Sequence, residues 1–75
     1  MSLPMLMVAY TVEMKNGSSK SGTVAVPGTD PNLACRAVVG LVRGSTGAKY
    51  ARPKCFADIM PHEVDDVTAT CIGNA

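Results

Sequence analysis

Few side chains in this sequence could perform chemistry: its 75 residues include one histidine and three cysteines. Nineteen residues separate Cys35 from Cys55, and 15 separate Cys55 from Cys71. A structural zinc site needs four ligands and usually contains a Cys-x-x-Cys pair, which is missing here even if His62 is counted as the fourth ligand. A secreted disulfide scaffold would show an even, dense set of cysteines. The spacing favours small reduced thiols that are buried or half-buried, with a zinc site, a reactive thiol or an intermolecular disulfide as alternatives.

The densest polar cluster is His62, Glu63, Asp65 and Asp66. Adjacent side chains on a strand point to opposite faces, so these carboxylates do not converge unless other parts of the fold bring them together. This pattern favours a solvated acidic turn over a metal site or an acid/base pair. We therefore predict that the protein is not an enzyme and uses no metal or cofactor. The alternative is an enzyme or metal protein built around Cys55, His62 and Cys71.

Charge is distributed unevenly along the chain, although the formal net charge is only +1. A 19-residue stretch without Asp or Glu holds five basic residues: Arg36, Arg43, Lys49, Arg52 and Lys54. The next acidic residues fall within nine residues that contain no Lys or Arg: Asp58, Glu63, Asp65 and Asp66. A basic segment is thus followed by an acidic one.

The basic segment suggests three interpretations. Its charges could orient the chain on a protein partner, they could grip nucleic-acid phosphates while Tyr50 stacks on a base, or the basic and acidic segments could neutralise each other. The basic segment contains a single aromatic residue, and the pI of the chain is near 7.7; both observations argue against nucleic acid as the ligand. We predict a protein partner of unknown identity, with RNA or DNA as the alternative. The predicted binding residues are Arg36, Arg43, Lys49, Tyr50, Arg52 and Lys54.

Alternation of side chains predicts a β-hairpin at the start of the chain. The segment from Met7 to Lys15 alternates with period two, which is typical of a half-buried strand. Asn16-Gly17 is the strongest hairpin signal in the sequence. We expect residues 16–22 to form the loop and residues 23–26 to form the second strand, which ends at Pro27-Gly28.

The spacing of apolar residues predicts one helix from Pro31 to about Arg43. Asp30 is suited to the N-cap and Pro31 to the first helical position, while Gly44 can take the left-handed conformation after the last turn. We expect one apolar stripe to lie on the sheet, made of Leu33, Ala34, Ala37, Val38, Leu41 and Val42.

The remaining chain predicts one further strand and a region that could be a strand or an irregular turn. Val64 to Ile72 alternates, with Val67, Ala69 and Cys71 on one face, whereas residues 55–60 show no clear pattern. The predicted fold class is α+β, in the order β-β-α-(β)-β. It has a single antiparallel sheet of three or four strands and one helix packed on one face.

The size of the chain predicts a single domain over residues 1–75, with residues 1–6 as a frayed tail. The apolar N-terminus lacks a basic segment and is interrupted by Pro4, so we expect neither export nor membrane insertion. A cytoplasmic location is the expectation that follows. A domain of this size has a small core and unpaired strand edges, which favours association with a partner or with a second copy as a homodimer.

The Asn16-Gly17 hairpin and the Gly28-Thr-Asp-Pro31 entry into the Ala/Val-rich helix also carry a family resemblance. In these features, which cover about half of the sequence, the chain resembles small β-β-α-β proteins of phages and mobile elements, anti-CRISPR proteins among them. The resemblance implies a module that acts by binding, as an inhibitor or an adaptor. No individual functional residue is carried over from it.

Overall fold

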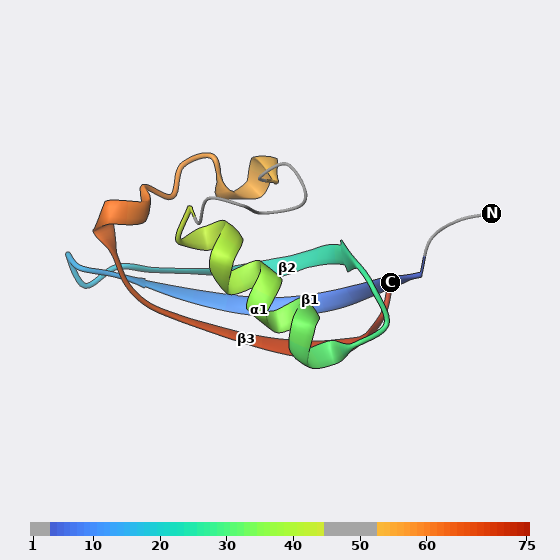
Figure 1. Ribbon diagram of the computed structural model, residues 1–75. Coiled ribbons are helices and arrows are strands. Elements are labelled where there is room, and N and C mark those ends of the chain that lie inside the picture. Colours follow the sequence, from blue (N-terminus) through green and yellow to red (C-terminus); the bar gives the residue numbers. More distant parts are fainter. Residues whose placement is uncertain (1–3, 45–52) are drawn as a thin grey trace.

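The fold is a three-stranded antiparallel sheet with one helix packed on one face (Figure 1). The computed structural model describes residues 4–44 and 53–75. Strand β1 (Met5–Met14) is central and lies between β2 (Ser19–Pro27) and β3 (Val64–Asn74). The predicted α+β class with a single antiparallel sheet is confirmed, and the described residues form three of the three or four predicted strands.

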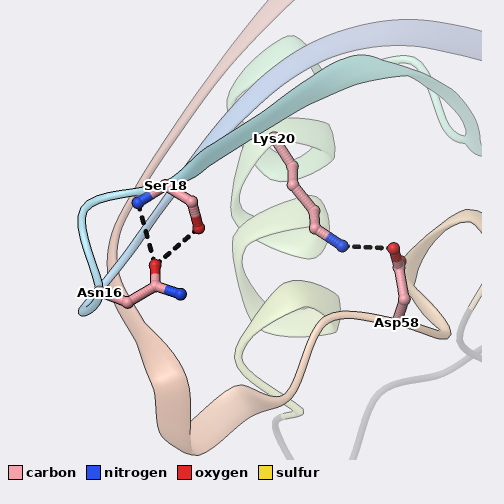
Figure 2. A network of polar contacts seen from close by, with 4 residues as sticks. All are labelled: Asn16, Ser18, Lys20 and Asp58. Carbon is pink, nitrogen blue, oxygen red and sulfur yellow. Dashed lines mark hydrogen bonds and ion pairs between the residues drawn. The ribbon is translucent and has the colours of Figure 1, made fainter.

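The hairpin between β1 and β2 is tighter than the sequence predicted. The Asn16 side-chain oxygen accepts hydrogen bonds from the Ser18 amide at 2.9 Å and the Ser18 hydroxyl at 2.6 Å (Figure 2). Gly17 adopts a φ of +90°, which favours glycine at this position. The second strand starts at Ser19 instead of Thr23. Residues 19–22 have low strand propensity, but they pair with Tyr10 to Glu13 of β1 and so extend the strand.

The N-terminal prediction also needs correction. Met5 and Leu6 belong to β1, where they pair with Pro27 and Val26, so they are not part of a frayed tail. Leu6 is buried in the core.

Helix α1 (Pro31–Val42) begins and ends as predicted. The Asp30 carboxylate accepts a hydrogen bond from the Asn32 amide at 3.0 Å, and Gly44 has a φ of +68° after the C-cap residue Arg43. The predicted apolar stripe is wrong at one position, because Leu33 is 60% exposed. The buried positions of the helix are Ala34, Val38, Leu41 and Val42. The side of the helix that they form faces the sheet, so Leu33 lies on the flank.

The segment after the helix contains no strand within its described residues. Two short 3₁₀ helices, η1 (Lys54–Phe56) and η2 (Pro61–Glu63), cover the same face of the sheet as α1 (Figure 1). Phe56 and Ile59 anchor this segment, since both are almost completely buried. The Phe56 ring packs edge-on against Tyr10 of β1, with ring centroids 4.9 Å apart.

The core therefore lies on one side of the sheet only, between the strands and the layer formed by α1 and residues 53–63. On β3 the predicted common face of Val67, Ala69 and Cys71 is confirmed, and this face packs partly buried against the core. The opposite face of the sheet carries no described element (Figure 1). We call it the open face; it includes exposed residues such as Thr11, Thr68 and Thr70.

Candidate binding surface

Two of the predicted binding residues, Arg36 and Arg43, lie on the solvent side of α1. They are seven positions apart, which is two helical turns, so their Cα atoms lie about 10 Å apart along one side of the helix. Both side chains are exposed because the buried stripe of α1 faces the sheet. The helix thus presents two guanidinium groups on one side, two helical turns apart.

Lys54 is the third predicted binding residue that the structure places. It is exposed at the start of η1, after Pro53. The end of α1 lies against the neighbouring η2, because a Cβ atom on Gly44 would come within 2.8 Å of the Pro61 side chain. Arg43 and Lys54 therefore belong to two segments of the same layer. We call Arg36, Arg43 and Lys54 the helix-side basic surface.

The other predicted binding residues, Lys49, Tyr50 and Arg52, lie outside the described residues. The structure therefore neither groups them with the helix-side basic surface nor separates them from it.

The ion pairs of the described residues do not use the helix-side basic surface. Asp58 binds Lys20 of β2 (Figure 2), and Glu63 lies 3.7 Å from the neighbouring His62. The hydrogen bond from Lys20 holds the pKa of Asp58 below its ordinary value. Asp58, which belongs to the acidic segment, is thus paired with Lys20, which lies outside the basic segment. Over residues 4–44 and 53–75, Arg36, Arg43 and Lys54 have no acidic partner.

The two aromatic residues that the structure places are both in the core. Tyr10 is 7% exposed and Phe56 is fully buried. Burial raises the pKa of Tyr10, and a hydrogen bond with the Cys55 side chain raises it further. Neither ring is available to stack on a nucleic-acid base.

The residues considered for metal or acid/base chemistry do not form a cluster in the described part of the chain. No group of three His, Cys, Asp or Glu side chains there is arranged to hold a metal ion. The three cysteines are free thiols: Cys55 is exposed, while Cys35 and Cys71 are half-buried. No helix among the described residues has the length and apolar character to cross a membrane.

Sequence reasoning missed the open face. The β1–β3 register places Glu13 directly opposite Asp66 on this face, and like charges in that arrangement disfavour strand pairing. Within the strands, the open face carries these two carboxylates and no basic side chain. Alternation along β1 places Glu13 on the face opposite to Val12 and Met14, but only the register shows its neighbour on β3. The helix layer and the open face therefore differ in charge.

Comparison with known proteins finds no protein-family model, curated protein or solved structure that matches the chain. The resemblance to anti-CRISPR proteins accordingly stays a prediction.

Proposed function

We propose that this chain is a small non-catalytic module that binds an acidic surface of a protein partner through the helix-side basic surface. One observation carries the proposal: Arg36, Arg43 and Lys54 are exposed on one layer and have no acidic partner among the described residues, although the chain has six acidic residues. Their charges are therefore available to a second molecule.

The arrangement on α1 suits recognition of carboxylates. A guanidinium group is planar and can donate two parallel hydrogen bonds to one carboxylate. Because Arg36 and Arg43 are about 10 Å apart, they would engage two separate acidic groups on the partner. Such charges fix orientation and speed association more than they raise affinity, which fits a small adaptor or inhibitor.

Nucleic acid is the alternative ligand for the same three basic side chains. Phosphates would satisfy Arg36, Arg43 and Lys54 equally well, but the placed rings, Tyr10 and Phe56, are buried and offer no stacking platform. Titration of the full chain against labelled single-stranded RNA and DNA at low and high salt separates the two classes. Phosphate contacts give an affinity that falls steeply with salt, so tight, strongly salt-dependent binding to either probe would contradict the protein-partner proposal.

The protein partner is sought by affinity capture from lysate of cells that naturally produce the chain. Wild-type protein and the variant R36E/R43E/K54E are compared by quantitative mass spectrometry, with K15E as a control because Lys15 is exposed at the hairpin and outside the helix layer. We expect at least one protein to be retained by wild type and K15E and depleted with the triple variant. If no captured protein is depleted with the triple variant, the proposal is wrong.

A further inference from the structure

Strand β3 is an outer strand with one free edge. It pairs only with β1 in the sheet order β2-β1-β3, and no described segment runs along its other side (Figure 1). Eleven residues belong to this strand. An exposed edge of this length presents unpaired N–H and C=O groups that can pair with another strand.

The hydrogen bonds of β1 identify which backbone groups of β3 are free. The Met14 amide donates to Ser18 on the β2 side, whereas the Lys15 amide donates to Glu63, just before β3. Because the direction alternates along a strand, odd-numbered residues of β1 bond to β3. Their partners include Thr68 and Thr70. The backbone groups of the intervening residues therefore point away from the sheet; these residues are Val67, Ala69 and Cys71.

The central part of this edge lacks the features that usually prevent strand addition. Residues 67–71 contain no charged residue and no Pro, and the two register irregularities lie beyond either end of this stretch. The other edge strand differs, since β2 contains Lys20, Gly22 and Pro27. Of the two edges, β3 is the one open to pairing.

We propose that β3 pairs antiparallel with β3 of a second copy, around a two-fold axis at Ala69. Ala69 then faces Ala69 of the second copy, and Val67 faces Cys71 of the second copy, each pair exchanging both backbone hydrogen bonds. The side chains of Val67, Ala69 and Cys71 are half-buried in the monomer. In the dimer they would cover one another on the helix side of a continuous sheet.

The register brings no like charges together across the two-fold axis, which is the reason for choosing a second copy as the occupant. On the open face, Thr68 meets Thr70 of the second copy, and Asp66 meets Ile72 of the second copy. The acidic ends of the two strands therefore lie far apart and no like charges oppose each other. This interface goes beyond the proposed partner binding, and its strand pairs include none of Arg36, Arg43 and Lys54.

Sedimentation equilibrium of the full chain from micromolar to millimolar concentration tests the dimer. Wild type is expected to show a monomer–dimer equilibrium. The variant T68K/T70K places lysine opposite lysine twice at the proposed interface and should raise the dimer dissociation constant at least about tenfold. The matched control is S21K/T23K, because Ser21 and Thr23 lie at the same positions across β1 from Thr68 and Thr70 and are also exposed. The control should dimerise like wild type.

Mixing T68K/T70K with T68E/T70E tests the register itself. Opposite charges would then face each other, and a heterodimer tighter than either homodimer is expected. Circular dichroism checks that each variant is folded, and the glutamate variant serves in place of the lysine variant if that one fails to fold. A wild-type monomer at every concentration overturns the proposal, as does equal weakening by S21K/T23K or the absence of a heterodimer.

Discussion

Burial at individual helix positions separates the residues that stabilise α1 from those that do not. Val38 is fully buried, whereas Leu33 is 60% exposed although it is the larger side chain. Removing buried methyl groups loses transfer free energy and leaves a cavity, while truncating an exposed side chain costs little. We expect Val38→Ala to lower the free energy of unfolding by about 2 kcal/mol and Leu33→Ala by less than about 0.5 kcal/mol.

Urea denaturation of both variants and wild type measures this difference. Circular dichroism in the absence of urea shows whether each variant keeps its helix. Equal destabilisation by the two substitutions would mean that Leu33 is covered and that the orientation of α1 is different.

Some residue-level features cannot be predicted from sequence because they depend on register. Gly22 reads as a loop residue in the sequence, yet it lies in β2 directly opposite Tyr10. A Cβ atom at this position would come within 2.9 Å of the Tyr10 phenol oxygen. The sequence shows Gly22 and Tyr10, but only the strand register shows that the Tyr10 ring lies over Gly22.

Elements whose bounds are set by residues close in sequence were predictable, whereas elements that depend on contacts between distant residues were not. The bounds of α1 were predictable because Asp30, Pro31 and Gly44 act through neighbouring backbone groups. The start of β2 and the conformation of residues 54–63 were not, because they depend on pairing with β1 and on burial of Phe56 and Ile59. Half of the predicted binding residues were placed as exposed, and the other half lie outside the described residues.

The Lys20–Asp58 ion pair connects β2 to the segment that carries η1 and η2 (Figure 2). Because the folded-state pKa of Asp58 is lowered, its contribution to stability is present above the ordinary aspartate pKa of 3.8 and is lost as the pH falls through the lowered value. Lys20→Met is therefore expected to lower the melting temperature at pH 7, by no more than about 4 °C because the pair is exposed.

Thermal melts of Lys20→Met and wild type across pH 2 to 7 check this prediction. The control Lys15→Met removes a base that has no ion pair among the described residues and should melt like wild type at pH 7. The deficit of Lys20→Met should shrink toward zero near pH 2. A deficit of constant size down to that pH would show that the lysine acts through packing and not through the Asp58 charge.

The whole molecule has two unlike sides. The helix layer carries Arg36, Arg43 and Lys54 together with Glu63 and with Asp58, which is paired with Lys20, while the open face carries Glu13 and Asp66. The net charge of +1 conceals this separation. A partner that approaches with carboxylates is attracted to the helix layer and repelled by the open face, so charge alone gives the complex an orientation.

The dissociation constant between the captured partner and single charge-reversal variants tests this orientation most directly. Arg43→Glu and Lys15→Glu change the net charge equally, but only Arg43 lies on the helix-side basic surface. By isothermal titration calorimetry, we predict that Arg43→Glu weakens binding at least about tenfold and that Lys15→Glu stays within about twofold of wild type. Equal dissociation constants for the two variants would contradict binding through the helix-side basic surface.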